Sequence, residues 1–314
     1  MQRLGLLALT VPGFVLLALP ACGAQTGGPT LGGPCDADSP CNSGEVCDFT
    51  AQDGPICITG EGDLDGDGIP NAMDFCEHAM GGASDEDRDG IGDDCDHCPI
   101  AAPRATADPD GDNVDSPCDP DPHEAGDEIL LFESFSESAL DTRWKATTPT
   151  VWKVQGGEVI ATATAAGPQD YLTTLVVGKS NISIEASYRV DRVDTGASPT
   201  QHIVALYMSD PRPAGVANMS CGVTMAEGGP GELVLVETNQ NAMNQLAKAA
   251  AFDSASLYRA GGYVSGNSAA CSVLGNNTPL GTVQATITPD QLSSISLTAK
   301  AVTARFQYVL VVGR

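Results

Sequence analysis

The chain has 314 residues and a formal net charge of −26 at pH 7, from 41 acidic and 15 basic residues. The charge is local, because residues 61–128 hold 22 Asp or Glu and two Arg, whereas residues 129–314 are nearly neutral. This balance excludes a nucleic-acid partner, which would require a basic stripe. Self-repulsion should keep the acidic segment extended until divalent cations neutralise it.

Residues 1–21 have the features of a secretory signal. A short positive start, Met1–Arg3, precedes an apolar run, Leu4–Leu19, that is too short to span a membrane. The following Leu19-Pro20-Ala21-Cys22 resembles the lipobox of bacterial lipoproteins. The resemblance implies cleavage before Cys22 and a membrane anchor through lipidation of that residue. We expect an outer-membrane lipoprotein exposed at the cell surface, with a secreted protein as the alternative.

The cysteine content fits an oxidising compartment. Eleven cysteines are present, and removing Cys22 leaves ten that can form disulfides. Residues 22–34 form a flexible tether, and residues 35–60 form a small module that is too short to build a core without bridges. Its four cysteines allow three pairings, among which the sequence does not choose: Cys35, Cys41, Cys47 and Cys57.

Three acidic loops of twelve residues follow, starting at residues 63, 85 and 108. Each has Asp at positions 1, 3, 5 and 12, a turn-permissive Gly or Asn at position 6, and Ile or Val at position 7. Alternate carboxylates plus the backbone carbonyl of position 7 are the ligand pattern of Ca²⁺, which takes about six to eight oxygens. The predicted ligands of the three loops are Asp63, Asp65, Asp67, Ile69, Asn71 and Asp74; Asp85, Asp87, Asp89, Ile91, Asp93 and Asp96; and Asp108, Asp110, Asp112, Val114 and Asp119.

The cysteines follow the same period of 22 to 23 residues as the loops. Cys76 and Cys98 each lie thirteen residues after the first Asp of their loop, and Cys95 and Cys118 each lie ten after theirs. The outermost repeats lack only the cysteine that would have no neighbour. We therefore expect the bridges Cys76–Cys95 and Cys98–Cys118, each joining one repeat to the next.

The segment 61–124 resembles the thrombospondin type 3 repeat, through its Asp-x-Asp-x-Asp-Gly loops and the Asp-Asp-Cys-Asp-His-Cys-Pro run at 93–99. The resemblance implies calcium held by a chain that wraps around the ions with almost no helix or strand. The third loop departs from the family pattern, since Asn113 replaces Gly and Ser116 replaces an acidic or amide residue.

Other interpretations of the acidic loops fit less well. An EF-hand or a dockerin would need helices beside each loop, and Gly and Cys residues stand there instead. A disordered acidic tract would leave the cysteine register unexplained. A zinc site built from Cys95, His97 and Cys98 with Cys76 or His78 is disfavoured, because a Cys-x-x-Cys pair outside the cytosol indicates disulfides.

From residue 127 to 314, short alternating apolar segments predict an antiparallel β-sandwich. Cys221 and Cys271 are the only cysteines there and are expected to form a bridge. The predicted fold class is all-β, with a C-terminal jelly-roll sandwich preceded by disulfide-rich, calcium-wrapped repeats with little regular secondary structure. The predicted strands are 129–135, 151–154, 158–164, 171–177, 182–190, 202–209, 221–225, 232–237, 257–264, 282–287 and 306–312.

The opening and closing strands of this domain resemble those of concanavalin-like (laminin-G-like) jelly rolls. The resemblance rests on Phe-Glu-Ser-Phe at 132–135, Arg143-Trp144, Val151-Trp152 and the final Arg-Phe-x-Tyr-Val-x-Val at 305–311. It implies the fold and places both tryptophans in the core.

The sandwich shows no catalytic motif in its sequence. A retaining glycosidase of this fold would be expected to carry Glu-x-Asp-x-Glu on one strand, and the chain has none. Glu232 and Glu237 are an odd number of residues apart and point to opposite faces of a strand. His202 has no acid or nucleophile partner in the sequence pattern. These observations predict that the protein is not an enzyme.

The sequence therefore predicts a non-enzymatic, calcium-binding cell-surface lipoprotein, anchored through Cys22. Its repeats would form a stalk that presents a sandwich for adhesion or for binding a glycan or a surface protein. The alternatives are a purely structural envelope protein and, as the third choice, a carbohydrate-active enzyme.

Overall fold

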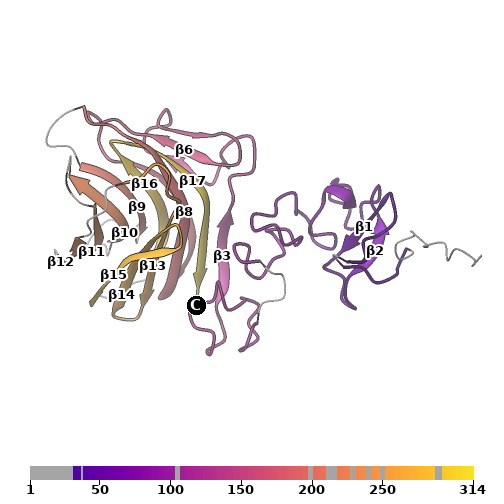
Figure 1. Ribbon diagram of the computed structural model, residues 1–314. Coiled ribbons are helices and arrows are strands. Elements are labelled where there is room, and N and C mark those ends of the chain that lie inside the picture. Colours follow the sequence, from indigo (N-terminus) through magenta and orange to yellow (C-terminus); the bar gives the residue numbers. More distant parts are fainter. Residues whose placement is uncertain are drawn as a thin grey trace, which may run out of the picture.

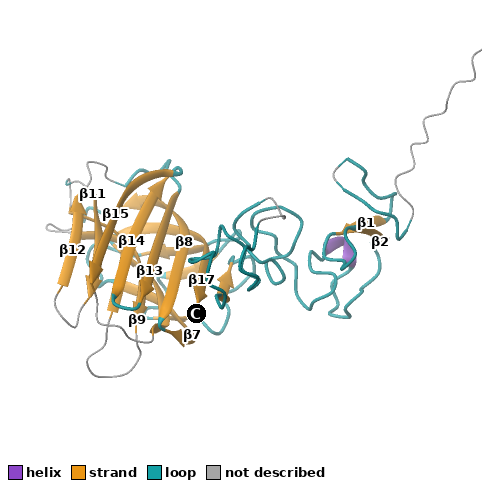
Figure 2. Cartoon of the chain, turned by 90° about the horizontal axis from the view of Figure 1, so that it is seen from below, coloured by secondary structure: helices purple, strands orange, loops and turns teal. Residues whose placement is uncertain are grey.

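The computed structural model describes residues 31–36, 38–102, 107–196, 201–209, 218–226, 229, 231–237, 242–247, 252–286 and 292–314, without the side chains of 218, 233–237 and 242–247. Within these residues the protein is all-β apart from one short 3-10 helix (Figures 1 and 2). None of the described helices is long and apolar enough to cross a membrane. The predicted signal segment 1–21 and Cys22 lie outside the described residues.

Residues 127–314 form a sandwich of two antiparallel sheets, as predicted. The first is a seven-stranded sheet with the order β12-β11-β10-β9-β16-β7-β4. Its strands are β4 (Lys145–Ala146), β7 (Asp170–Lys179), β9 (Gln201–Ser209), β10 (Asn218–Ala226), β11 (Gly231–Glu237), β12 (Ala242–Ala247) and β16 (Leu292–Lys300).

The second is an eight-stranded sheet with β15-β14-β13-β8-β17-β6-β5 in order and β3 paired with β17. It brings the first and last strands of the domain side by side, because β17 pairs antiparallel with both β3 and β8. Its strands are β3 (Glu128–Glu133), β5 (Trp152–Val154), β6 (Val159–Thr162), β8 (Asn181–Val193), β13 (Tyr258–Ser265), β14 (Ser268–Gly275), β15 (Thr278–Thr286) and β17 (Val302–Gly313).

The core lies between the two sheets, where alternate residues of each strand point inward. Tyr188 of β8 is fully buried, stacks on Tyr258 with ring centroids 5.3 Å apart, and packs against Phe306 at 5.7 Å. Burying apolar surface of this size stabilises the fold by about 1.5–3 kcal/mol, less a cost for the Tyr188 hydroxyl, which is buried without a hydrogen bond. Both predicted core tryptophans are buried and hydrogen-bonded, Trp152 to the Asp170 carboxylate at 2.7 Å.

The Cys221–Cys271 disulfide joins the two sheets, since Cys221 is on β10 and Cys271 is on β14. In the chain-entropy description, closing a loop of this length stabilises the fold by about 4 kcal/mol. Gly262 lies opposite Cys271 and faces the core. A Cβ at that position would lie 2.8 Å from the Met219 methyl group, so a larger residue beside the bridge would require this methionine to move.

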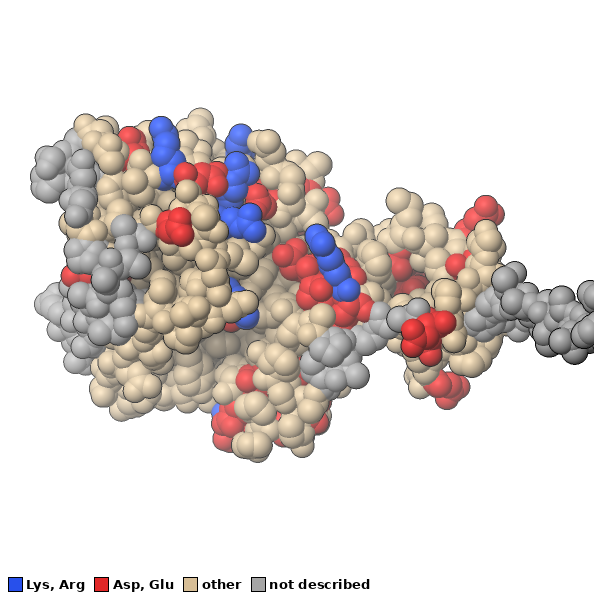
Figure 3. All heavy atoms as spheres, in the orientation of Figure 1, with Lys and Arg blue, Asp and Glu red and all other residues tan. Residues whose placement is uncertain are grey.

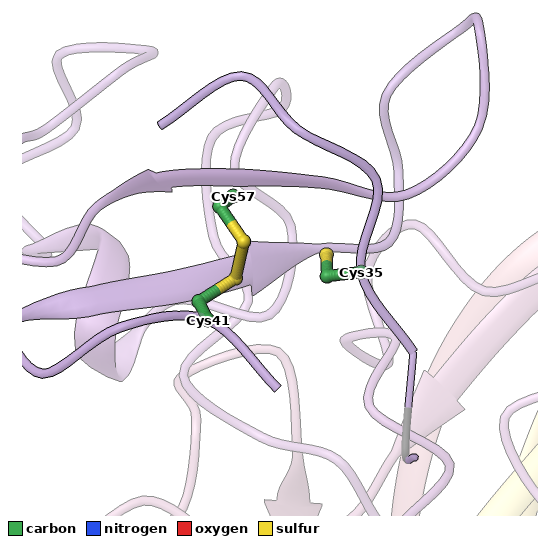
Figure 4. Close-up of side chains that lie close together, drawn as sticks. All are labelled: Cys35, Cys41 and Cys57. Carbon is green, nitrogen blue, oxygen red and sulfur yellow. A yellow bond between two sulfur atoms is a disulfide. The ribbon is translucent and has the colours of Figure 1, made fainter. Parts of the chain in front are cut away.

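The small module before the repeats is a hairpin of β1 (Glu45–Asp48) and β2 (Ile56–Thr59), held by two disulfides. The bridges are Cys35–Cys47 and Cys41–Cys57, which resolves the three pairings that the sequence leaves open. Figure 4 shows the Cys41–Cys57 bond with Cys35 beside it. His78 Nε2 lies 2.8 Å from the buried Asp48 carboxylate, so the module is also packed against the first repeat.

The repeats have almost no regular structure, as their composition predicts. Over 61–102 and 107–124, the helical element is the 3-10 turn η1 (Asn71–Met73). The two bridges that the cysteine register predicts are both present, Cys76–Cys95 and Cys98–Cys118.

The repeats do not form a separate stalk along their whole length. The third repeat packs against the outer face of the eight-stranded sheet, where Leu310 and Val312 of β17 form a buried apolar cluster with Cys98, Val114 and Cys118. Figures 1 and 2 show this segment lying alongside β3 and β17. The predicted stalk is therefore in part a covering layer on the sandwich.

Candidate metal centres and the surface of the sandwich

The three acidic loops each bring their first three aspartates together. In each loop, one carboxylate oxygen from positions 1, 3 and 5 lies within 4.8 Å of the other two. The clusters are Asp63, Asp65 and Asp67; Asp85, Asp87 and Asp89; and Asp108, Asp110 and Asp112. Figure 3 shows the acidic side chains gathered over the repeats, whereas Lys and Arg lie mainly over the sandwich.

The first aspartate of each loop fixes the turn. Its Oδ1 accepts the backbone N–H of position 4 and its Oδ2 accepts that of position 6, at 2.7–3.1 Å in all three loops. Both of these positions have positive φ, which Gly and Asn tolerate best. Asn113 therefore replaces Gly in the third loop without changing the turn. The six residues are Gly66, Gly68, Arg88, Gly90, Gly111 and Asn113.

The aspartate at position 12 is held in the same way in each repeat. Its Oδ1 accepts the backbone N–H of the residue two places further on, at 2.7–2.8 Å. In Asp74 and Asp119 the second oxygen, Oδ2, is buried and has no hydrogen-bond partner. The aspartates at position 3 also have buried oxygens without a hydrogen-bond partner. These atoms are Asp65 Oδ2, Asp87 Oδ2 and both carboxylate oxygens of Asp110.

These orphaned oxygens test whether the loops suit a cation. A buried carboxylate oxygen without a donor costs free energy, and several of them around one point repel each other. A hard divalent cation with oxygen ligands removes both costs. The donor set is all oxygen in each loop, which fits Ca²⁺ and does not fit zinc.

Position 9 helps to close each loop, and its use as a ligand stays a prediction, with Asp93 Oδ2 buried without a hydrogen bond. The side-chain oxygens of Asn71 and Asp93 accept the backbone N–H of position 2 of their own loops, at 3.0 and 2.8 Å. In the third loop, Ser116 donates its hydroxyl to the Ala107 carbonyl at 2.6 Å. The described contacts of position 9 thus close the loop around the cluster.

Sequence reasoning missed one carboxylate beside the third cluster, Asp127. Its backbone N–H and that of Gly126 both donate to Asp112 Oδ2, at 2.7 and 2.9 Å. Asp127 Oδ2 is buried without a hydrogen bond and lies 3.9 Å from Arg314 Nη1. The residue is outside the twelve-residue loop, so the loop pattern could not identify it.

Burial raises the pKa of several carboxyls around the centres. Desolvation, with the nearby Asp89 and Asp87 charges, raises the pKa of Asp96 to about 7. Desolvation also raises the pKa of Asp127 to about 6, opposed by Arg314 and reinforced by Asp119. These carboxyls hold protons more tightly than free Asp in the absence of a cation.

The cysteines do not offer a thiolate site. Cys35, Cys41 and Cys57 have sulfurs close enough to hold an ion, but all three are in disulfides. The same holds for Cys95 and Cys98, so the zinc alternative loses its ligands.

The histidine and the tryptophans of the sandwich are structural. His202 is buried, with Nδ1 2.9 Å from the Ala301 carbonyl. Trp144 is also buried, and its indole donates to Glu133 at 2.9 Å. Glu232 of β11 lies opposite Thr224 of β10, on the outer face of the seven-stranded sheet. The side chain of Glu237 is not among those that the structure describes.

Two adjoining hollows occupy the outer face of the eight-stranded sheet. One has a volume of about 310 Å³ and lies between the third repeat and strands β8, β13 and β14. The other, of about 400 Å³, lies over β14 and β15. Tyr263 and Ala270 line both, so the two hollows adjoin at these residues and are together called the groove below.

Comparison with solved structures places the sandwich among known folds. A GlcNAcα1-4Gal-releasing endo-β-galactosidase from Clostridium perfringens is 10% identical over 60% of this chain and 64% of its own, just under two thirds of its length, with a TM-score of 0.44. An endo-1,3-β-glucanase from Streptomyces sioyaensis is 12% identical over 60% and 97%, with a TM-score of 0.44. The carbohydrate recognition domain of Emp47p is 12% identical over 57% and 91%, with a TM-score of 0.42.

At this level of identity the likeness shows the jelly-roll sandwich fold alone. No protein-family model matches the chain, and no curated protein is significantly similar to it in sequence.

The comparison contradicts the prediction of a non-enzymatic protein, and with it the predicted function as an adhesion or binding stalk. The solved structures that overturn it include two endo-acting glycanases, each similar to this chain with a TM-score of 0.44. The lack of Glu-x-Asp-x-Glu on one strand does not by itself exclude an enzyme. In a sandwich, carboxylates from different strands and from covering loops can also meet, and sequence spacing does not detect such pairs.

Proposed function

We propose that the protein is an extracytoplasmic calcium-binding protein in which three Ca²⁺ ions fold the repeats and fasten the third repeat to the β-sandwich. Each ion would be held by the aspartates at positions 1, 3, 5 and 12 of one loop and by the carbonyl of position 7. The third would also be held by Asp127.

The observation that carries this proposal is the recurrence of buried, unpartnered carboxylate oxygens at the same loop positions. Position 3 has one in all three loops, and position 12 has one in the first and third. Among the described residues no Lys, Arg or His forms an ion pair with these carboxylates, while a Ca²⁺ ion would neutralise them in every loop. Extracellular sites of this kind typically bind with dissociation constants of about 0.1–1 mM.

Calcium would act on the sandwich through the third loop. Val114 at position 7 of that loop is buried in the cluster that contains Leu310 and Val312. Asp112 accepts hydrogen bonds from Gly126 and Asp127, which lead directly into β3. An ordered third loop is therefore needed to cover the outer face of β17.

The test is calorimetric titration of Ca²⁺ into the full mature chain with oxidised cysteines, after removal of metal on a chelating resin. We expect about three ions per chain for the native protein. Asp110→Asn should remove one binding event, because it neutralises the oxygens that have no other partner. Asp53→Asn, an exposed aspartate in the cysteine-rich module, is the matched control. Absence of binding to the native protein would refute the proposal.

We also propose that the chain is held at the membrane of the cell envelope through lipidated Cys22. The supporting observation is the Leu19-Pro20-Ala21-Cys22 run after an apolar signal segment. The test compares the native protein with Cys22→Ser by partitioning extracts of expressing cells between a detergent phase and an aqueous phase. The native protein should enter the detergent phase, and the variant should stay in the aqueous phase. Aqueous partitioning of the native protein would rule out the anchor.

A further inference from the structure

We propose that the groove on the outer face of the eight-stranded sheet binds a neutral oligosaccharide, with the Tyr263 ring as its platform and the third repeat as one wall. This goes beyond the calcium function proposed above. Only the dependence of the groove on Ca²⁺, through that wall, rests on the earlier proposal.

The groove is large enough for more than one sugar ring. Its two parts, of about 310 and 400 Å³, each reach the lower end of the roughly 300–1,000 Å³ range of small-ligand sites. They lie on either side of Tyr263, which lines both. A ligand that fills the groove must therefore extend along the sheet past the tyrosine, as a short oligosaccharide does.

The floor of the groove is flat and carries hydroxyl groups. One row across the sheet, set by strand register, runs from Glu185 through Gly261 and Ser272 to Thr282. A Cβ added to Gly261 would meet only the Ser272 hydroxyl, at 3.6 Å, so the space above this glycine is open. A sugar ring can approach the backbone there and exchange hydrogen bonds with the serine and threonine.

Tyr263 is suited to stack on a sugar. The side chain is half-buried on the outer face, between the two hollows. Among the described residues it takes part in no aromatic pair and no hydrogen bond, unlike Tyr188, Tyr258 and Tyr308. An unpaired aromatic face with a free hydroxyl at its edge complements the apolar face and the equatorial hydroxyls of a hexopyranose.

Glu185 supplies a fixed acceptor at one end of the groove. Its Oε1 accepts from the Tyr308 hydroxyl at 2.7 Å and from Arg259 Nε at 2.9 Å. Its Oε2 has no donor among the described residues and is free to accept a sugar hydroxyl. Donors that hold Oε1 also fix the direction of Oε2, which reduces the entropy lost on binding.

Charge selects a neutral ligand. Glu185 and Asp119 are the charged side chains that line the groove, and both are acidic. Arg259 is paired with Glu185 and compensates its charge, which leaves Asp119 as the uncompensated charge among the side chains that line the groove. An anionic saccharide or a phosphate would be repelled by this carboxylate.

The third repeat forms the remaining wall through Pro117, Cys118, Asp119 and Pro120. Asp119 is also position 12 of the third loop, so the same residue belongs to the metal centre and to the groove. Calcium at that centre would fix the wall in place. By linkage, a ligand in the groove must then raise the affinity of the third centre for Ca²⁺ by the same factor.

The experiment is calorimetric titration of the full mature chain with four hexasaccharides as probes: laminarihexaose, cellohexaose, xylohexaose and neoagarohexaose. Each titration is done with saturating CaCl₂ and after removal of calcium on a chelating resin. The variants are Tyr263→Ala, which removes the platform, and Gly261→Val, which fills the floor without touching the core. Tyr171→Ala, on the outer face of the opposite sheet, is the matched control.

We expect at least one probe to bind the native protein in calcium, and both groove variants to weaken it by roughly tenfold or more. Tyr171→Ala should bind like the native protein, and removal of calcium should lower the affinity. Failure of all four probes to bind would overturn the proposal. So would retained binding in both groove variants, or loss of binding in Tyr171→Ala alone.

The two proposals fail separately. A chain that binds sugar through Tyr263 but takes up no Ca²⁺ keeps the groove and refutes the calcium function. A chain that binds Ca²⁺ but none of the four probes keeps the calcium function and refutes the groove.

Discussion

The backbone N–H of Asp127 donates to Asp112 Oδ2 at 2.7 Å, which ties the last acidic loop to the residue that precedes the first strand of the sandwich. The Asp127 carboxylate is buried at the same point and leaves Oδ2 without a hydrogen bond. The junction between repeats and sandwich is thus built around a buried carboxylate that faces Arg314 Nη1 at 3.9 Å and accepts no hydrogen bond at Oδ2.

Replacing Asp127 by Asn should weaken the third calcium site. The variant keeps the backbone hydrogen bonds and removes one negative charge from the ligand set. We expect a loss of roughly 1.4 kcal/mol, or about tenfold in dissociation constant, for one of the three sites. Titration calorimetry would measure it, with Asp53→Asn as the control. Unchanged affinity at all sites would show that Asp127 is not a ligand.

The calcium-free protein should lose stability as pH rises from about 4 to 7. The pKa of Asp96 is raised to about 7 and that of Asp127 to about 6, above the ordinary value of 3.8. Between 3.8 and those values the folded state binds more protons than the unfolded state, so raising the pH favours unfolding.

With calcium the dependence should reverse, because the ion binds the deprotonated carboxylates. Thermal unfolding of metal-free and calcium-loaded protein between pH 4.5 and 8 would test both signs. A metal-free protein that becomes more stable over this range would contradict the assignment of these carboxyls.

Replacing Leu310 by Ala should loosen the repeats from the sandwich. Its side chain is 4% exposed and packs on the cluster that contains Cys98, Val114 and Cys118. Truncation of a buried leucine costs about 2–5 kcal/mol, and here the cost falls on the docking surface.

Limited proteolysis in calcium should then cut the repeats faster in Leu310→Ala than in the native protein. Leu175→Ala, at a site that is 68% exposed, is the control. Equal cleavage rates would mean that this cluster does not hold the repeats in place.

Replacing Phe306 by Ala should destabilise the sandwich itself. The side chain is fully buried and touches Tyr188 and Trp152, with ring centroids 5.7 and 6.1 Å apart. The expected cost is about 3–5 kcal/mol in free energy of unfolding, measured by urea titration. Val177→Ala, exposed on β7, should change it by less than about 0.5 kcal/mol. A change of less than about 0.5 kcal/mol in the free energy of unfolding for Phe306→Ala would show that this side chain is not part of the core.

The sequence predicted most strands of the sandwich and missed four, which are β4, β12, β14 and β16. All eleven predicted strands are present. The central strand β16 was missed because Ser294, Ser296 and Thr298 are small hydroxyl residues that resemble a loop, although all three are buried. This segment is a strand because it pairs with β7 on one side and β9 on the other. Pairing between distant segments cannot be predicted from the pattern of a single sequence.

Docking of the repeats did leave a signal in the sequence. Residues 308–312 of β17 read Tyr-Val-Leu-Val-Val without alternation, and all five are buried. An unbroken apolar run indicates a strand covered on both faces. The covering partner lies almost 200 residues earlier in the chain, so the run alone could not identify it.

The five disulfides also bear on how the chain can mature during export. The four bridges before the sandwich join cysteines 12 to 20 residues apart, and none crosses from one local set to another. As synthesis proceeds from the N-terminus, the partner of each bridge becomes available shortly after the first cysteine of the pair. The exception is Cys221–Cys271, which spans 50 residues and joins opposite sheets. That bond has to wait for the two layers to meet, which makes it the step at which a disulfide isomerase would matter most.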